Sequence, residues 1–389
     1  MDIRNAETPQ SNCWLEIDCR AVAANLDTLR NKTKSRFMAV VKHNGYGLSL
    51  LEYARLLTSL GVRELAAGTY EEAVALRDGG IDASILLLTP QASSANVAEL
   101  IKRGVMLTVG SRTQAEAARR AAAETGLTPQ IHIKIDTGLG RYGFQPEDLQ
   151  YVPDAVQGMD IQGIYTHFSS PYLSERTTRR QYEAFARAVE QLRANHVCAG
   201  TLHCCASGGL LNYPQMHLDM VRAGSALLGR VPNASEHRLT PAVYLKAPVM
   251  AVKAAHSSSG IGYGRAVGLK RSACVGVLSV GCASGLPAPR QLAGLLRRKQ
   301  YAVVNGRRAE ILGALGIGAL AVDLTGIRCG EGDIARLDVN PLYCAANIQR
   351  VYDRAEDAFA PPLAQRCAAH AGASAETGAI GLPKIASHS

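Results

Sequence analysis

Eight short apolar runs recur over the first 230 residues, and helix-like stretches separate most of them. The runs are residues 37–41, 64–67, 85–88, 105–109, 131–135, 161–165, 201–203 and 219–222. The helical candidates between them include residues 70–77, 114–124 and 178–195. Eight such β-then-α units predict an α/β chain with a (β/α)8 TIM-like barrel. An open doubly wound sheet is the alternative, but no Gly-x-Gly-x-x-Gly fingerprint follows an early strand.

The pattern changes after about residue 230, where strand-rich stretches replace the alternation. They cover residues 249–255, 273–281, 301–312 and 319–324. Asn305-Gly306 is a strong hairpin signal, so we expect two strands in the third stretch. Residues 14–18 are also strand-like and are expected to pair with this second part of the chain. We therefore predict a barrel domain over residues 12–232, a β-rich C-terminal domain over residues 233–354, and a poorly ordered tail over residues 355–389.

Composition excludes several classes of protein. The net charge of +9 is spread over scattered basic residues, which indicates a solvated basic surface rather than a nucleic-acid site. The ten cysteines lack the spacing of a metal or redox motif, so no metal site is expected. The N-terminus is polar, and no apolar run approaches the roughly 20 residues of a membrane helix. These features favour a cytoplasmic protein with free thiols and no membrane contact.

Lys42 follows directly after the first apolar run. A residue at the carboxyl end of a barrel strand faces the mouth where such barrels carry their active sites. There, desolvation favours the neutral amine, which can form an imine. A surface lysine that caps a strand is the simpler alternative, and position alone favours it.

The residues around Lys42 favour an active-site lysine over a surface lysine that caps a strand. The stretch Val40-Val41-Lys42-His43-Asn44-Gly45-Tyr46-Gly47 closely resembles the lysine motif of alanine racemases, which bind pyridoxal 5′-phosphate (PLP). Further motifs of that family follow in order along the chain. They are residues 133–141, 163–168, 203–207, 219–224, 262–265 and 322–326. The similarity spans roughly residues 12 to 350, and the ordered set is far more specific than any single motif.

The resemblance implies a role for each matching residue. Lys42 would hold PLP as a Schiff base and act as the base on one face of the substrate carbon. Arg141 would lie near the substrate carboxylate, with Lys134 behind it. The residues implied in cofactor binding are Tyr46 and Ser207 at the phosphate, with Gly224 and the backbone N–H of Ser225, His167 beside the pyridine ring, and Arg222 at the pyridine nitrogen.

Arg222 bears most directly on the type of reaction. An arginine donates hydrogen bonds and stays charged, so it cannot accept the proton of a pyridinium. The cofactor would then stay unprotonated and be a weaker electron sink. This favours removal and return of an α-proton over the decarboxylation carried out by a related barrel family, which has an acidic partner there.

The chain departs from the family in the half of the site that a partner subunit supplies. The family's second base is a tyrosine in a Gly-Tyr-Ala-Asp-Gly-like loop, which here reads Gly-Cys-Ala-Ser-Gly with Cys282 at the tyrosine position. The family's Cys-Met-Asp stretch, which helps hold the substrate carboxylate, is replaced by residues 316–318, Gly-Ile-Gly. A C-terminal tyrosine that binds phosphate has no clear counterpart, since Ala346 or Asn347 falls there.

Three functional interpretations remain open. Cys282 acts as the second base of an amino-acid racemase, a role that a thiol with a pKa near ~8.5 permits. Alternatively, Lys42 works alone, as in an epimerase, lyase or aldolase type of PLP enzyme. The third is a PLP-binding protein with little catalysis, and in the last two Cys282 only fills space. The resemblance implies a homodimer with shared active sites and a small substrate such as alanine or serine, although the Gly-Ile-Gly stretch leaves room for a larger one.

Overall fold

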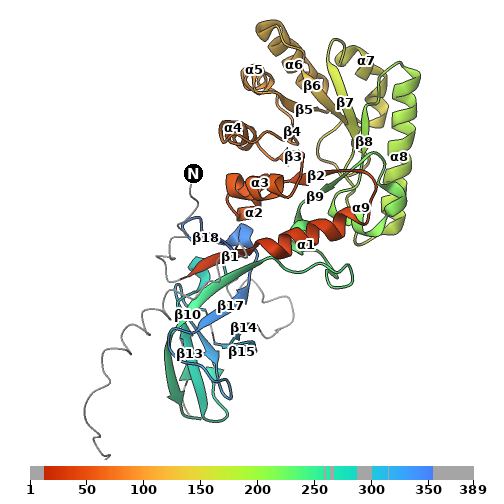
Figure 1. Cartoon of the computed structure of the whole chain (residues 1–389). Helices are drawn as coiled ribbons and strands as arrows, with labels where there is room; N and C mark the ends of the chain where they lie inside the picture. Colours follow the sequence, from red (N-terminus) through yellow and green to blue (C-terminus); the bar gives the residue numbers. More distant parts are fainter. Residues whose placement is uncertain (1–12, 258–259, 263–266, 287–299, 314, 354–389) are drawn as a thin grey trace, which may run out of the picture.

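The computed structural model describes residues 13–257, 260–262, 267–286, 300–313 and 315–353. It contains a barrel and a β-rich domain that join through long strands (Figure 1). The expected tail at residues 355–389 and the motif residues 263–265 lie outside the described residues.

The first sheet forms the wall of the barrel. Its strands lie in the order β8-β7-β6-β5-β4-β3-β2-β9, and all its pairings are parallel. They are β2 (Arg36–Val40), β3 (Glu64–Ala67), β4 (Ser84–Leu87), β5 (Val105–Val109), β6 (Gln130–Lys134), β7 (Asp160–Tyr165), β8 (Thr201–His203) and β9 (Met220–Ala223). Backbone hydrogen bonds from Asp219 N to Leu202 O (3.1 Å) and from Arg222 N to Cys205 O (2.9 Å) close the ring. The predicted barrel is confirmed, with a strand at each of the eight apolar runs.

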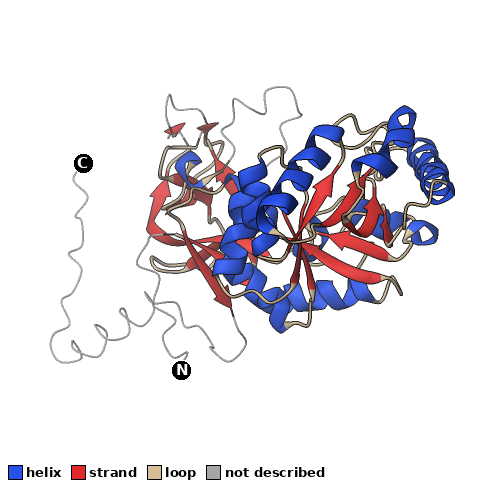
Figure 2. Ribbon diagram, turned by 90° about the horizontal axis from the view of Figure 1, so that it is seen from above, coloured by secondary structure: helices blue, strands red, loops and turns tan. Residues whose placement is uncertain are grey.

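Helices cover the outside of this sheet (Figure 2). The helical elements of this domain are α1 (Cys19–Arg30), α2 (Lys42–Gly47), α3 (Leu50–Ser59), α4 (Tyr70–Asp78), α5 (Ser94–Lys102), α6 (Arg112–Thr125), α7 (Val152–Ala155), α8 (Glu175–Ala194) and α9 (Ser207–Asn212). Of these, α2 and α9 follow β2 and β8 at the mouth of the barrel, where they carry residues of a cavity. The side chains of Ser93, Ser111 and Ser174 accept a backbone N–H in the first turns of α5, α6 and α8, and Thr69 forms a capping box with Glu72. These caps fix where α4, α5, α6 and α8 begin, and thereby the length of the loops that precede these four helices at the barrel mouth.

The β-rich domain is built on a second sheet, with strand order β13-β16-β15-β14-β17-β10-β1-β18. The strands are β1 (Trp14–Asp18), β10 (Val243–Ala255), β13 (Ala273–Leu278), β14 (Tyr301–Val304), β15 (Arg307–Leu312), β16 (Leu320–Asp323), β17 (Ile334–Asp338) and β18 (Gln349–Asp353), beside the separate pair β11 (Gly260–Ile261) and β12 (Val267–Gly268). β10 pairs with both β17 and β13, which closes six strands on themselves. The hairpin at Asn305-Gly306 joins β14 to β15 as predicted, with both residues at positive φ.

Strands from both ends of the chain tie the two domains together. β1 pairs antiparallel with β10 and parallel with β18, which confirms that residues 14–18 join the second sheet. From β18, Arg350 Nε donates to Gly47 O at 3.0 Å and the Tyr352 hydroxyl donates to Leu48 O at 2.7 Å. The β-rich domain therefore braces the segment that directly follows Lys42. The proposed domain boundary near residue 232 lies in the connection between Leu228 and β10.

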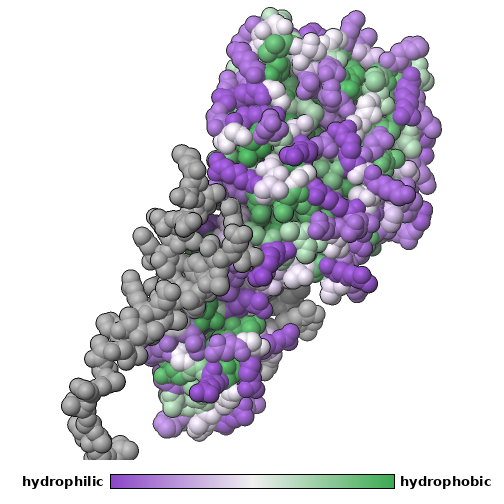
Figure 3. Space-filling view, in the orientation of Figure 1, coloured by the Kyte–Doolittle hydropathy of each residue, from purple (hydrophilic) through white to green (hydrophobic). Residues whose placement is uncertain are grey.

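Hydrophilic side chains dominate the visible surface of the barrel, whereas hydrophobic ones gather on parts of the β-rich domain and near the junction (Figure 3). Among the helices of the described residues, none has the length and apolar character needed to cross a bilayer.

Candidate active site

One cavity of about 310 Å³ opens among the carboxyl ends of the barrel strands. It brings together every candidate residue that the sequence placed on the barrel: Lys42, Tyr46, Arg141, His167, Ser207, Arg222, Gly224 and Ser225. Lys134 and Tyr165 also line it. Cys282 is the exception, because it lies in the β-rich domain and does not line this cavity.

Lys42 begins the turn that follows β2 and points into this cavity from its half-buried position. Burial lowers the pKa of its amine, and the nearby Arg141 lowers it further, while Glu72 partly opposes both. A lowered pKa increases the share of neutral amine near pH 7, which is the form that reacts with a carbonyl.

The backbone after Lys42 adopts a left-handed turn that the sequence analysis did not predict. His43, Asn44, Gly45 and Tyr46 have φ values of 54°, 53°, 63° and 58°. Three of these residues have side chains, so the conformation is strained. Hydrogen bonds from Asn44 N to Glu72 Oε1 (2.7 Å) and from Leu50 N to Asn44 Oδ1 (2.8 Å) hold it in place. The turn directs both Lys42 and Tyr46 toward the cavity, and the Asn-Gly pair was the available signal for it.

Close packing shapes one end of the cavity as a cradle for a small anion. The Ser207 hydroxyl oxygen accepts hydrogen bonds from Gly224 N (3.2 Å) and Ala226 N (3.3 Å). A Cβ atom on Gly224 would lie only 2.0 Å from the hydroxyl oxygen of Tyr46, so only glycine fits there. Tyr46, Ser207 and the backbone at Gly224 and Ser225 therefore converge at a site that suits a phosphate group.

Arg222 is fully buried in β9 and is fixed from several sides. Its guanidinium donates to His203 Nδ1 at 2.5 Å and to Thr166 O at 2.8 Å. Since arginine only donates, His203 must carry its proton on Nε2 and donate it to His132 Nδ1, which lies 2.9 Å away. Tyr165 stacks on His203 with ring centroids 4.8 Å apart. This series of hydrogen bonds holds Arg222 rigidly at the floor of the cavity.

Both His203 and His132, the two histidines hydrogen-bonded in line with Arg222, are held neutral. Burial and the charge of Arg222 lower the pKa of His132 to about 3, and they lower that of His203 well below its usual range. The same causes lower the pKa of His167, which lines the cavity. Neutral rings beside Arg222 leave its positive charge uncompensated, so the cavity attracts an electron-rich acceptor such as an unprotonated pyridine nitrogen.

This arrangement predicts a loss of stability in acid. Below pH 6.5 the unfolded chain protonates His132, but the folded protein does not until about pH 3. The free energy of unfolding therefore falls as pH drops through this window, by up to ~1.4 kcal/mol per pH unit for one ring. Urea denaturation over this range should give a shallower pH dependence for His132→Gln than for the unchanged protein. An equal pH dependence in the two proteins would show that the His132 ring already takes up a proton in the folded protein over this range.

A second buried cation, Lys134, lies at the end of β6. Its Nζ has no hydrogen-bond partner among the described residues and lies 5.3 Å from the centroid of the Tyr165 ring. Burial, followed by the charge of Arg222, lowers its pKa to about 8. Nearby, Asp136 accepts backbone N–H groups from residues 138–141, which shapes the loop that carries Arg141. Lys42, Lys134, Arg141 and Arg222 together give the cavity a strongly positive character.

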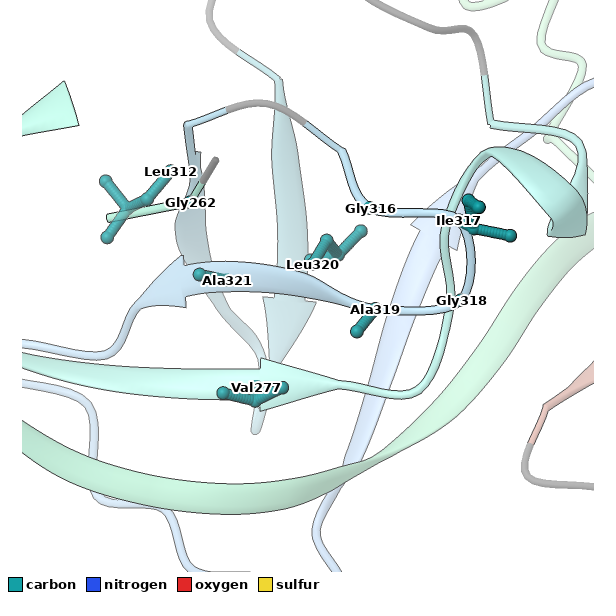
Figure 4. Close-up of a pocket in the computed structure, with 9 residues that line it drawn as sticks. All are labelled: Gly262, Val277, Leu312, Gly316, Ile317, Gly318, Ala319, Leu320 and Ala321. Carbon is teal, nitrogen blue, oxygen red and sulfur yellow. The ribbon is translucent and has the colours of Figure 1, made fainter. Parts of the chain in front are cut away.

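Cys282 begins a 3-10 turn, η5 (Cys282–Ser284), in the β-rich domain, and its thiol is exposed. Backbone hydrogen bonds from Cys282 N to Gly316 O (3.1 Å) and from Ala283 N to Ile317 O (2.9 Å) fix the turn against the loop Gly316-Ile317-Gly318. Figure 4 shows this loop crossing beside the turn, at the rim of an apolar cavity of about 520 Å³. The two segments in which the sequence departs from the alanine racemase pattern are thus neighbours in space.

The cavity in the barrel fits PLP on the chemistry of its own residues. The cradle at Ser207 and Gly224 suits the phosphate, Arg222 suits the pyridine nitrogen, and Lys42 suits the carbonyl carbon. No group of side chains among the described residues has the makeup of a metal site. The fold and this cavity define a PLP-dependent enzyme built on a (β/α)8 barrel.

Comparison with known proteins identifies the family. The model of the alanine racemase N-terminal domain matches residues 17–232, and that of the C-terminal domain matches residues 242–352. The chain is 31% identical to an alanine racemase of Desulforamulus reducens and 30% identical to one of Methanococcus maripaludis, over 80% and 82% of this chain and 85% and 87% of those proteins. A solved alanine racemase from the D-cycloserine producing Streptomyces lavendulae has a TM-score of 0.79 and 27% identity, covering 90% of this chain and 98% of that one. The chain belongs to the alanine racemase family and is a PLP-dependent amino-acid racemase.

Proposed function

We propose that the enzyme racemises a small amino acid such as alanine or serine, with Lys42 on one face of the substrate carbon and Cys282 of a second copy on the other. The observation that carries this proposal is that one positively charged cavity gathers Lys42, Arg141, His167 and Arg222. Tyr46, Ser207, Gly224 and Ser225 would hold the phosphate of PLP, and Arg222 would face its pyridine nitrogen. When bound, PLP withdraws electrons from the substrate and makes its α-proton acidic.

In this proposal each protein group has a defined task. Lys42 Nζ removes or returns the α-proton on its own face, and its lowered pKa favours that exchange near neutral pH. Arg141, with Lys134 behind it, lies at the cavity and would attract the substrate carboxylate. Arg222 would donate a hydrogen bond to the pyridine nitrogen without transferring a proton to it. The ring would then remain a weaker electron sink, which suits removal and return of a proton. The Cys282 thiol would take or give the proton on the opposite face.

The position of Cys282 supports a homodimer with shared active sites. Cys282 does not line the cavity of its own chain, and the turn that carries it is bordered by exposed hydrophobic side chains. Ile317 and Tyr343 are 75% and 73% exposed, and their backbones contact this turn. Leu173, beside the barrel mouth, is 90% exposed. Such hydrophobic residues favour burial against a second copy. No disulfide joins the nine cysteines of the described residues, which supports a cytoplasmic location.

Complementation between two inactive variants tests the shared site. In a mixed dimer of Lys42→Ala and Cys282→Ala subunits, one of the two sites combines an intact Lys42 with an intact Cys282. Co-expression of the two variants should therefore restore roughly a quarter of the wild-type racemisation, because half of the dimers are mixed and each has one complete site. The controls are the two variants expressed separately.

Two results would contradict the shared site. Co-expression could yield no more activity than the better single variant. That result would indicate that Lys42 of one subunit and Cys282 of the other do not act together in one active site. Alternatively, the protein could be fully active as a monomer in sedimentation and dilution experiments. The one-base interpretation, in which Lys42 acts alone, would then be favoured.

A further inference from the structure

Tyr172 lies in the loop between β7 and α8 and lines the same cavity as Lys42 and Ser207. Its hydroxyl group is buried and has no hydrogen-bond partner among the described residues. A buried donor without a partner is costly, so such a group at a ligand cavity indicates an acceptor that arrives with the ligand. No sequence motif singled out this residue.

The loop packs Tyr172 against Gly208, the residue that follows Ser207 of the anion cradle. A Cβ atom on Gly208 would lie 2.9 Å from Tyr172 Cε2 and 2.6 Å from Pro171 Cγ, so the loop packs tightly on the residue next to Ser207. Asn212 Nδ2 donates to Pro171 O at 3.2 Å, which ties the loop to the far end of α9. Ser169 N donates to Gln181 Oε1 at 2.9 Å, which ties it to α8. The Tyr172 ring is therefore positioned by packing rather than free to turn outward.

The chemistry of the cavity defines the missing acceptor. Burial raises the pKa of Tyr172 to about 12, so its hydroxyl stays protonated and donates across the working pH range. The charged groups that face the cavity are Lys42, Lys134, Arg141 and Arg222, which are all basic. An anionic oxygen is the acceptor that such surroundings favour.

We propose that the Tyr172 hydroxyl is an additional hydrogen-bond donor to the phosphate group of PLP. The inference rests on the proposed cofactor site and adds a residue of this chain to it. It also accounts for the missing C-terminal tyrosine. Ala346, which falls near that position in the sequence, lines a different cavity with His43, Asn44 and Pro341. Tyr172 supplies from the barrel loop a donor that the β-rich domain no longer provides.

The test compares two forms of the cofactor. PLP and pyridoxal, which lacks the phosphate, are titrated into cofactor-free protein, and the dissociation constant of each is measured by absorbance and fluorescence. Tyr172→Phe should weaken the binding of PLP by about ten- to a hundred-fold, as expected for loss of a hydrogen bond to a charged group. Pyridoxal should bind equally well to both proteins. Tyr53→Phe is the matched control, because its hydroxyl is also buried without a partner but does not line the cavity.

Each outcome decides the proposal. A selective loss of PLP affinity in Tyr172→Phe supports the phosphate contact. Unchanged PLP affinity, or equal weakening of PLP and pyridoxal, overturns it, since the second result indicates that the ring only packs. If the unchanged protein binds PLP on Lys42 but Tyr172→Phe has no effect, only this inference fails. If the unchanged protein binds no PLP, the proposed cofactor site fails as well.

Discussion

Lys42→Ala is expected to abolish both the visible absorbance of bound PLP and racemisation. Lys42 reaches the cavity from the turn after β2, and burial lowers the pKa of its amine. Its loss removes the covalent attachment and one of the two bases together, so the rate should fall by roughly 10⁴-fold or more. The absorbance spectrum and a chiral assay of the product measure the two effects separately.

Lys134→Ala is the matched control for the attachment, because Lys134 is another lysine that lines the same cavity. That variant should keep the absorbance of attached PLP. Borohydride reduction followed by peptide mapping should place the label on Lys42 in the unchanged protein. A label on Lys134 or on any other lysine would contradict the assignment.

The second large effect is expected at Cys282. Cys282→Ala should slow racemisation by about 10²–10⁴-fold, the range for loss of an acid–base group. The absorbance of PLP on Lys42 should stay unchanged, because Lys42 and the other residues proposed to hold PLP all line the barrel cavity and remain intact in this variant. Cys282→Tyr should restore or raise racemisation of alanine if the turn keeps the geometry of the family.

Cys198→Ala is the matched control for Cys282→Ala. Cys198 is also an exposed cysteine, but it precedes β8 and so lies at the opposite end of the barrel strands from the cavity. This variant should racemise substrate at the rate of the unchanged protein. If Cys282→Ala did the same, the cysteine would be a small filler in the turn and not a base.

Periodicity of the sequence was sufficient to predict the barrel, because each strand of a parallel sheet is a short apolar run between helices. The hairpin at Asn305-Gly306 and the pairing of β1 with the second sheet were also predicted. Only Lys42 could be placed at the barrel mouth from its position after a strand. The other barrel residues of the candidate site were grouped through the resemblance to the alanine racemase motifs.

Other features depend on contacts between distant segments and have no local pattern. His132 and His203 belong to β6 and β8, and only the barrel closure brings them into line with Arg222. Tyr172 lies in an irregular loop whose path is set by packing on Gly208. The left-handed turn after Lys42 opposes the intrinsic preference of its residues and is held by Glu72 from α4. Each is a case in which tertiary contacts override local preference.

Isotope exchange tests the two-base account most directly. Each enantiomer of alanine and serine is incubated with the enzyme in D₂O, and the α-deuterium content and configuration of the amino acid are followed together. The account predicts inversion with deuterium in the product from either enantiomer. With Cys282→Ala, it predicts exchange of one enantiomer only, with configuration retained, since Lys42 still acts on its own face. Exchange without inversion in the unchanged protein would contradict a second base and leave Lys42 as the only one.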